Sequence, residues 1–358
     1  MNLADFLNSM IEAHASDVFI VAGLPLTYRV DGHLVRSSED SPLSPADTEA
    51  MVWAFYEVAD RQYDHFAEQG NHDEDFSFAL FGVGRFRVNV FHQRGSVGAV
   101  VRVIPFGLPD PEECGIPEEV LQLTRFQKGL VLVTGSAGMG KSTTLACMID
   151  RLNHERSGHI VTMEDPIEYI HRHGTCIVTQ REIPTDVATF SEALRSATRE
   201  AADVILLGEM RDAETIATAL TAAEMSQLIF STLNTSTVES TINRIVDAFP
   251  PSQQRRIRMQ LSQVLQAIVS QQLVPARAGG VVPVFEIMTS TTAIRNLIRE
   301  GKTHQIDSVI AAGRDAGMRT MDQSLFALVQ DGTIDRSVAL QHAIHQEALA
   351  LRLDAEGL

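Results

Sequence analysis

The spacing of apolar residues changes near residue 105, and this change predicts two domains. Upstream of it, helical spacing predicts helices over 3–14 and 45–57, the second beginning with Ser44 as N-cap and Pro45 at the first helical position. Asp31-Gly32 predicts a hairpin turn. Apolar or alternating runs predict strands at 18–22, 26–30, 33–36, 75–80, 85–93 and 97–104. This order predicts a small α+β domain over residues 1–107.

Residues 108–118 are predicted to be a linker, because prolines crowd the segment 105–117. Beyond it, strands alternate with helices, which predicts a mostly parallel α/β sheet within a second domain over 119–358. The expected strands are 130–134, 159–163, 204–207 and 228–233, and the expected helices are 141–153, 190–199 and 213–225.

From residue 238 onward the pattern is mainly helical, and a helical C-terminal region is expected from about residue 290. One long helix is expected from Arg255 to near Leu273, then a strand over 281–288 and an amphipathic helix over 339–353. The three arginines Arg255, Arg256 and Arg258 leave two interpretations open: a solvated helix face, or contact with an acidic surface or a neighbouring subunit.

Composition excludes several classes of protein. The 29 basic residues against 46 acidic ones give a net charge of −17, which disfavours a protein that coats nucleic acid or anionic lipid. The three cysteines are scattered and predict neither a disulfide framework nor a zinc site. The longest apolar run, 50–56, is far shorter than a membrane span. No basic segment marks a signal peptide, so a cytoplasmic protein is expected.

A phosphate-binding loop is the strongest motif. The segment GSAGMGKS, 135–142, fits GxxxxGK[ST] between an apolar strand and a helical pattern. Such a loop wraps phosphate with backbone N–H groups, its lysine reaches the β- and γ-phosphates, and its serine binds Mg²⁺. A plain glycine-rich turn would leave Lys141, one of few lysines in the chain, unexplained. The predicted ATP ligands are Gly135, Ser136, Ala137, Gly138, Met139, Gly140, Lys141, Ser142 and Thr143.

Acidic residues follow two of the expected strands. Glu209 comes after the strand 204–207, displaced by one residue because Gly208 stands where Asp is usual, and it is predicted to lie beside Mg²⁺. Glu164, Asp165 and Glu168 follow the strand 159–163, at the edge where ligands bind in parallel sheets. One of them is expected to orient or deprotonate the attacking water, unless the segment is a solvated acidic loop.

Arginines alternate with apolar residues in the first domain. In the strand 85–93, Arg85 and Arg87 are expected to face away from Phe86 and Val88, and Arg94 follows at the turn. Two interpretations of this arginine-bearing face stay open. It is an ordinary polar face, or its arginines complete a nucleotide site on another subunit. His171 and His173 form an HxH pair, for which a polar loop is the preferred interpretation over a metal site.

With these pieces in place, the chain resembles the PilT-type type IV pilus retraction ATPases of the secretion ATPase superfamily. The segments ASDVFIVAG and RVDG resemble their PAS-like N-terminal domain, and GRFRVNVF their arginine-bearing strand. GSAGMGKSTT resembles Walker A, TMEDPIEYIH the Asp box and LLGEMRDAETIATALTAAE the atypical Walker B. The resemblance implies a PAS-like α+β domain followed by a RecA-like P-loop ATPase domain.

The resemblance also implies roles for individual residues. Lys141 and Ser142 would bind phosphate and Mg²⁺, Glu168 would be the catalytic glutamate and Glu209 the Walker B glutamate. Arg85, Arg87 and Arg94 would act on the ATP of the next subunit in a hexamer. The implied partners are a PilC-like inner-membrane platform protein and a paralogous pilus ATPase, with no nucleic acid and no membrane insertion. The implied place is the cytoplasmic face of the inner membrane.

The chain departs from this family at its His box. Gln227 and Asn234 replace the two histidines, and Asn234 retains an amide that donates to phosphate but carries no proton charge. Ser136, Ala137 and Met139 are milder departures in the P-loop. The segment AIRNLIRE, 293–300, favours retraction. The alternatives are a PilU-like accessory ring subunit with weak or partner-dependent activity, an assembly ATPase for pili or secretion, and a nucleic-acid translocase, which the charge disfavours.

Overall fold

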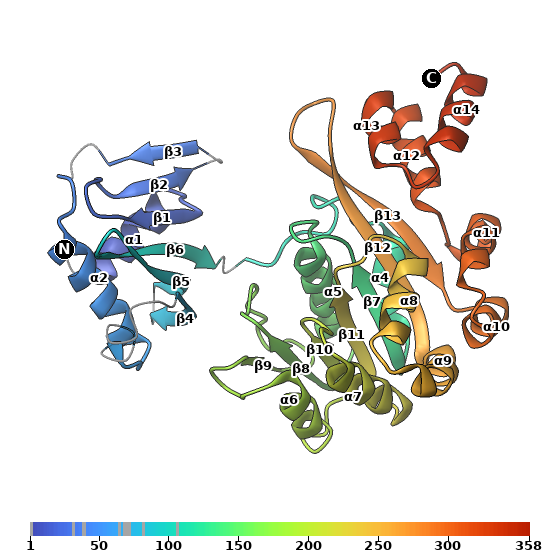
Figure 1. Ribbon diagram of the computed structural model, residues 1–358, viewed down its shortest axis with the longest axis horizontal. Coiled ribbons are helices and arrows are strands. Elements are labelled where there is room, and N and C mark those ends of the chain that lie inside the picture. Colours follow the sequence, from blue (N-terminus) through green and yellow to red (C-terminus); the bar gives the residue numbers. More distant parts are fainter. Residues whose placement is uncertain are drawn as a thin grey trace. The chain divides into compact units, whose positions relative to one another are not determined.

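The computed structural model describes residues 3–30, 33–37, 41–63, 66, 73–80, 83–104 and 107–358. It divides into two compact units, residues 1–107 with 168–170, and 108–167 with 171–358. Each unit has its own sheet (Figure 1). The predicted turn at Asp31-Gly32 and Pro105, just before the predicted linker, lie outside the described residues.

The first unit is an antiparallel sheet with helices. Its sheet has six strands in the order β3-β2-β1-β6-β5-β4. Helix α2 begins with a capping box in which Ser44 and Asp47 each accept a backbone N–H of the other residue. The elements are α1 (Leu3–Glu12), β1 (Asp17–Ile20), β2 (Thr27–Val30), β3 (His33–Arg36), α2 (Pro45–Val58), β4 (Glu74–Leu80), β5 (Gly84–Gln93) and β6 (Ser96–Ile104).

Strand β5 confirms the predicted alternation of apolar and basic residues. Phe86, Val88 and Val90 are fully buried in a core that also includes Phe6 and Phe55 from the two helices. The opposite face of the sheet carries the basic residues. There the register places Arg87 opposite Ser77 on β4 and Arg102 on β6, and Arg102 opposite Asp17 on β1.

The second unit is built on a sheet of seven strands in the order β13-β12-β7-β11-β10-β8-β9. All neighbouring strands are parallel except β13, which is antiparallel to β12. Strands β7, β10 and β11 are buried along their whole length, as expected for a parallel sheet covered on both faces. Before the P-loop lie α4 (Glu118–Leu121) and β7 (Gly129–Thr134), and after it follow α5 (Lys141–Glu155), β8 (His159–Glu164), β9 (Ile177–Glu182), α6 (Phe190–Ala197), β10 (Val204–Leu207), α7 (Ala213–Glu224) and β11 (Leu228–Leu233).

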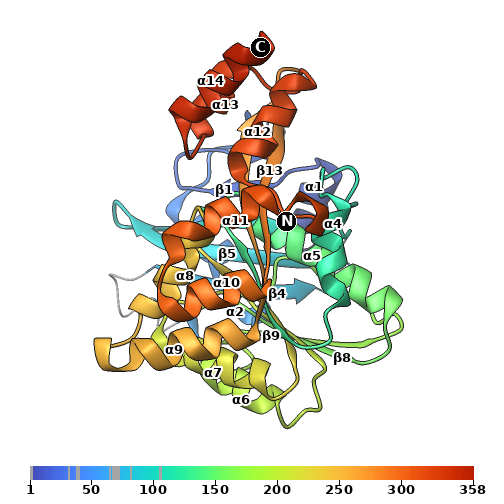
Figure 2. The same cartoon turned by 90° about the vertical axis from the view of Figure 1, so that its right-hand side faces the viewer.

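The remaining elements extend the sheet and add helices. They are α8 (Val238–Asp247), α9 (Pro251–Val264), β12 (Leu265–Pro275), β13 (Val281–Thr289), α10 (Thr292–Glu300), α11 (Ile306–Ala312), α12 (Met321–Gln330), α13 (Arg336–His342) and α14 (Gln346–Glu356). Figure 2 shows α9, α10 and α11 stacked along one side of this unit, and α10 packs against both α9 and α11. Among the described residues, no helix has both the length and the apolarity that crossing a membrane requires.

One prediction about this region is wrong, and one strand elsewhere in this unit was not predicted. The long helix expected to reach Leu273 ends at Val264, and the chain continues as β12 between β7 and β13. Ala267, Ile268 and Val269 are buried there, so pairing with two neighbours determines the conformation. Strand β9 was not predicted at all; it is an edge strand whose burial is partial.

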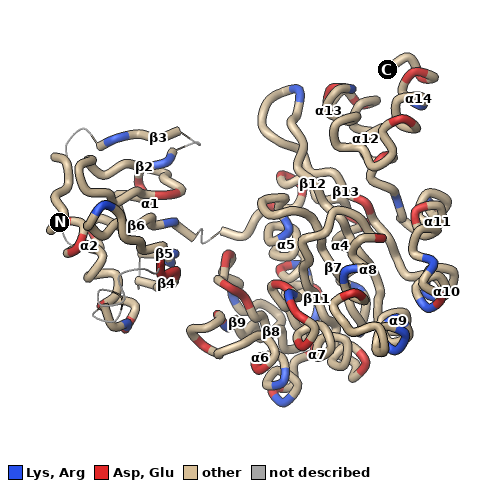
Figure 3. The backbone as a smooth tube through the Cα atoms, viewed as in Figure 1, with Lys and Arg blue, Asp and Glu red and all other residues tan. Residues whose placement is uncertain are grey.

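The helix expected over 339–353 is two helices, α13 and α14, separated by residues 343–345. The Asp322 carboxylate accepts the backbone N–H groups of Ile344 and His345, at 2.8 and 2.9 Å. A side chain from α12 therefore satisfies the donors at the break, which makes the break stable. Charged residues are spread along the chain in both units (Figure 3).

Candidate nucleotide site

The P-loop joins β7 to α5, as predicted. Ser136, Ala137 and Gly138 are exposed, so this part of the loop is open to a ligand. Gly135 and Gly140 have positive φ angles of 150° and 79°. A Cβ at Gly135 would lie 2.4 Å from the backbone oxygen of Gln271, and one at Gly140 would lie 2.9 Å from its Nε2 atom. Gly135 therefore requires glycine for close packing as well as for conformation, and Gly140 favours glycine for its conformation.

Strand β12 packs against this loop, a contact that the sequence pattern did not predict. Buried Gln271 accepts a 2.7 Å hydrogen bond from the Thr144 hydroxyl in the first turns of α5. The backbone N–H of Leu273 donates to the Met139 sulfur at 3.3 Å. The methionine that departs from the family pattern therefore contacts the neighbouring strand, while the exposed part of the loop stays open.

A hydrogen-bonded network joins the P-loop to the ends of β10 and β11. The Lys141 ammonium donates to the carbonyl oxygens of Gly135 and Ser136, at 2.7 and 2.9 Å, and to Asn234 Oδ1 at 2.9 Å. Asn234 Nδ2 in turn donates to Glu209 Oε1 at 2.7 Å. Asn234 thus connects the phosphate-loop lysine to the acid after β10.

Arg211 extends this network, and sequence reasoning missed it. Its guanidinium donates to Glu209 Oε2 at 2.8 Å and pairs with Asp165 at 3.5 Å. The hydrogen bond from Arg211 to Glu209 raises the pKa of the guanidinium, as expected for a cation between two carboxylates. Its position two residues after Glu209 was the available signal.

The donors at this site fit a magnesium ion. Mg²⁺ prefers hard oxygen ligands and is usually held by one or two protein oxygens together with substrate phosphates. Ser142 presents a hydroxyl in the first turn of α5, and Glu209 presents a carboxylate already within the network of the P-loop lysine. These are the two residues that the sequence predicted as metal ligands.

The acidic segment after β8 is only partly connected to this network. The Glu164 carboxylate accepts hydrogen bonds from Thr162 and Gln180, and Asp165 pairs with Arg211. Glu168 is exposed, and no hydrogen bond or ion pair joins its carboxylate to Lys141 or Glu209 within the described residues. The structure thus connects Asp165 to Glu209 but does not connect Glu168.

The two histidines of the HxH pair have separate surroundings. His171 is buried, and desolvation lowers its pKa to about 4, so its imidazole is neutral at pH 7. His173 uses Nδ1 to accept the backbone N–H of Val178 at 3.1 Å. These surroundings fit the polar-loop interpretation.

The arginines of the first unit have different partners. Arg87 makes a bidentate pair with Asp75, with a closest distance of 2.5 Å. Arg85 donates to the Ser77 hydroxyl at 2.7 Å. Arg94 is exposed at the β5–β6 turn with a φ of 46°. Carboxylate pairing therefore holds the Arg87 guanidinium beside Asp75.

The two replaced histidine positions lie at opposite ends of β11. Asn234 follows the strand and belongs to the network above. Gln227 precedes the strand, roughly 20 Å away by strand geometry. Its side chain is buried and donates to the backbone oxygen of Ala202 at 3.1 Å. Of the two departures, only Asn234 concerns the nucleotide site.

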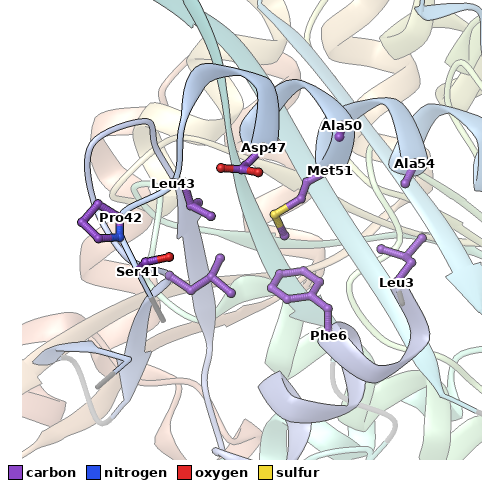
Figure 4. Close-up of a pocket in the computed structure, with 10 residues that line it drawn as sticks. Leu3, Phe6, Ser41, Pro42, Leu43, Asp47, Ala50, Met51 and Ala54 are labelled. Atoms are coloured by element: carbon purple, nitrogen blue, oxygen red, sulfur yellow. The ribbon is translucent and has the colours of Figure 1, made fainter. Parts of the chain in front are cut away.

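The first unit also contains a cavity of about 390 Å³ between α1, α2 and the residues before α2 (Figure 4). Apolar side chains such as Leu3, Phe6 and Met51 line most of it. Its carboxylate, Asp47, already accepts the backbone N–H of Ser44 in the helix cap. This cavity has no basic group among its lining residues and does not resemble a phosphate site.

Together, the sheet, the P-loop and the acids at the strand ends define a P-loop nucleotide-hydrolysing protein. The family model of the type II/IV secretion system proteins matches residues 2–316, so the chain belongs to this family. It is an ATPase of that family.

Individual relatives match over nearly the whole chain. The Pseudomonas aeruginosa protein named type IV pilus retractation ATPase PilT is 46% identical over 344 residues, covering 96% of this chain and 98% of its own. The type IV pilus ATPase PilU of the same organism is 40% identical over 354 residues, covering 99% and 91%. A crystal structure of the pilus retraction motor PilT with bound ADP has a TM-score of 0.89 at 43% identity, covering 98% and 99%.

Proposed function

We propose that this protein is a hexameric Mg-ATP-hydrolysing motor that powers type IV pilus retraction, and with it twitching motility, by disassembling pilin. The observation that carries the proposal is the link from Lys141 through Asn234 to Glu209, in a chain 46% identical to PilT. This link joins the group that would bind phosphate to the group that would bind the metal. The proposed architecture is a PAS-like N-terminal domain, a linker at 108–118 and a RecA-like ATPase domain over 119–358.

The reaction follows from the chemistry of these groups. Backbone N–H groups of residues 135–140 and the N-terminus of α5 bind the phosphates, together with Thr143. Lys141 leaves its carbonyl partners for β- and γ-phosphate oxygens. Ser142 and Glu209 would hold Mg²⁺, which neutralises charge on the phosphates. Glu168 accepts the proton of the attacking water, and Asn234 donates its amide hydrogen to a γ-phosphate oxygen.

The arginines of the first domain complete the site of the next subunit. In this proposal Arg85, Arg87 and Arg94 approach the ATP bound by a neighbour and stabilise the charge that develops on the transferred phosphoryl group. Arg87 exchanges Asp75 for phosphate, and Arg94 is already exposed at its turn. Such arginines are worth about 10³–10⁵ in rate in other nucleotide hydrolases.

The proposed partners follow from the family. The ring acts at the cytoplasmic face of the inner membrane, on a PilC-like platform protein, alone or with a paralogous pilus ATPase. Nucleic acid is not a partner, because the net charge of −17 opposes binding to a polyanion.

The test is the steady-state Mg-ATPase rate of the purified protein as a function of its concentration, with Glu168→Ala as the blank. We expect a specific activity that rises with concentration and disappears in the blank, because each site needs a neighbouring subunit. A rate equal to the blank at every concentration, with ATP still bound, contradicts an autonomous motor.

The second candidate is a PilU-like accessory ring subunit, which Asn234 in place of histidine and the 40% identity to PilU favour. It predicts negligible turnover alone and restored turnover with a paralogue. In cells, deletion separates the classes: loss of a retraction motor leaves excess pili, and loss of an assembly ATPase leaves none.

A further inference from the structure

The segment that carries Glu168 is fixed at both ends by side chains of β9. The backbone N–H of Ile167 donates to the Glu182 carboxylate at 3.1 Å. The backbone N–H of His171 donates to Gln180 Oε1 at 2.8 Å. These two donors bracket Glu168, one residue before it and three residues after it. Neither contact involves the Glu168 side chain itself.

One of these two side chains, Gln180, also connects to β8. Gln180 uses its amide nitrogen to donate to Glu164 Oε1 at 3.3 Å, so its two ends hold both flanks of the segment. The residues of β8 and β9 are paired in parallel register, with Thr162 opposite Gln180 and Glu164 opposite Glu182. Because Gln180 and Glu182 are two residues apart on one strand, they point to the same face of the sheet.

Burial makes the Glu182 contact unusual. Glu182 is only 2% exposed, although it is acidic and lies on the edge strand β9. Burying a carboxylate is costly unless it is hydrogen-bonded. The Glu182 carboxylate accepts such a bond from the backbone N–H of Ile167, the residue next to Glu168.

A third side chain fixes the segment to the P-loop helix. Asn153, in the last turn of α5, is 2% exposed. Its Nδ2 donates to the backbone oxygen of Arg172 at 2.7 Å, and its Oδ1 accepts the N–H of Gly174 at 3.0 Å. The helix that begins with Lys141 therefore ends in contact with the continuation of the Glu168 segment.

We propose that Gln180 and Glu182 are positioning residues for the Glu168 carboxylate, and that Asn153 joins the segment they hold to the P-loop helix. This inference rests on the proposed function, in which Glu168 accepts the proton of the attacking water. The two β9 side chains act on the backbone at Ile167 and His171, so they determine where Glu168 is carried without touching nucleotide. A displacement of about 1 Å at a catalytic group costs on the order of 10²-fold in rate.

The test compares Gln180→Met, Glu182→Ala and Glu182→Gln in the full-length protein. Gln180→Met and Glu182→Ala remove the acceptors for the backbone N–H groups, whereas Glu182→Gln keeps an acceptor in nearly the same shape. The matched control is Thr179→Val on the same strand, because the Thr179 hydroxyl bonds to His159 instead of to the Glu168 segment. Glu168→Gln reports on the proposed function itself.

We expect Gln180→Met and Glu182→Ala to lower kcat roughly 10- to 100-fold. The KM for Mg-ATP and the Kd for a fluorescent ATP analogue should stay within about twofold of wild type, and the oligomeric state should be unchanged. Glu182→Gln and Thr179→Val keep kcat within about threefold. If Glu182→Ala does not fold, Gln180→Met and Glu182→Gln still decide the question.

The outcomes separate the two proposals. Unchanged kcat in Gln180→Met and Glu182→Ala, with Glu168→Gln inactive, overturns the positioning role and leaves the catalytic role of Glu168 standing. Full activity in Glu168→Gln overturns that catalytic role and the inference with it. Equal losses of kcat and nucleotide affinity would show a merely structural role and also overturn the inference.

Discussion

Asn234 stands in the nucleotide site where the family resemblance implies a histidine. Its amide oxygen accepts from Lys141 while its amide nitrogen donates to Glu209. The residue therefore performs a bridging role without a titratable proton.

From this we predict the behaviour of two variants. Asn234→Leu should lower kcat about 10²-fold, since it breaks the bridge and removes a donor to phosphate. Asn234→His should retain activity and add an inflection between about pH 5.5 and 7.5, because histidine titrates there. Stopped-time phosphate release across this pH range measures the rates of both variants. An inflection of the same size in wild type would contradict the assignment of the inflection to the introduced histidine.

Glu286 gives a prediction about stability. It is buried on β13, accepts the backbone N–H of Val238 at the start of α8, and desolvation raises its pKa from 4.5 to about 7. Between these pH values the folded protein binds more protons than the unfolded chain. Stability from this group is therefore full below pH 4.5 and is lost as pH rises through 7.

Glu286→Gln should remove that loss while keeping an acceptor for Val238. We expect its melting temperature to exceed that of wild type by roughly 5 °C at pH 8 and to match it near pH 5. Thermal unfolding at the two pH values measures the difference, and an equal shift at both would exclude a charge effect.

At the scale of elements, helices α9 and α10 are joined through Arg295 of the AIRNLIRE segment. Its guanidinium donates to the backbone oxygens of Ser262 and Gln263, both at 2.8 Å, and to the Gln266 amide oxygen at 3.1 Å. Cations stabilise helix C-termini, whose last carbonyls lack partners within the helix. Arg295 thus caps α9 where the chain changes to β12.

Arg295→Met should lower the free energy of unfolding by about 1–3 kcal/mol, because charged hydrogen bonds to the end of α9 are lost and the aliphatic part of the side chain is kept. Arg299→Met, an exposed position of the same helix, should change it by less than about 0.5 kcal/mol. Urea denaturation of both variants provides the comparison. Equal losses would assign the effect to the helix as a whole.

At the scale of the whole molecule, the proposed site is shared between subunits. Lys141→Ala removes the phosphate-binding lysine, and Arg87→Ala removes an arginine that would act on a neighbour. Each variant alone should have an ATPase rate at least about 10²-fold below that of wild type. Mixed rings, however, contain interfaces with both groups intact.

A 1:1 mixture of the two variants should therefore recover activity at roughly a quarter of the interfaces, if subunits mix at random in a ring of head-to-tail contacts. The ATPase rate after co-expression or subunit exchange measures this recovery. Activity that stays at the level of the separate variants would show that Arg87 does not act across subunits.

The sequence pattern predicted local structure correctly wherever the residues that determine that structure are neighbours in the chain. The P-loop spacing, the Ser44-Pro45 start of α2 and the alternation around Phe86 in β5 were all predicted, and the structure places each as expected. Glu209 and Asn234 likewise follow strands, and at one edge of the parallel sheet Asn234 contacts Lys141 and links Glu209 to it.

Sequence pattern alone therefore predicts the class of site: a phosphate loop, acids at strand ends and a basic sheet face in a separate unit. The groups that support this site are visible only in the folded chain. Gln271 meets Thr144 because β12 pairs with β7, and Gln180 and Glu182 hold the Glu168 segment because β9 pairs with β8. Strand pairing joins residues distant in sequence, and the energy that selects it comes from partners that no local window contains.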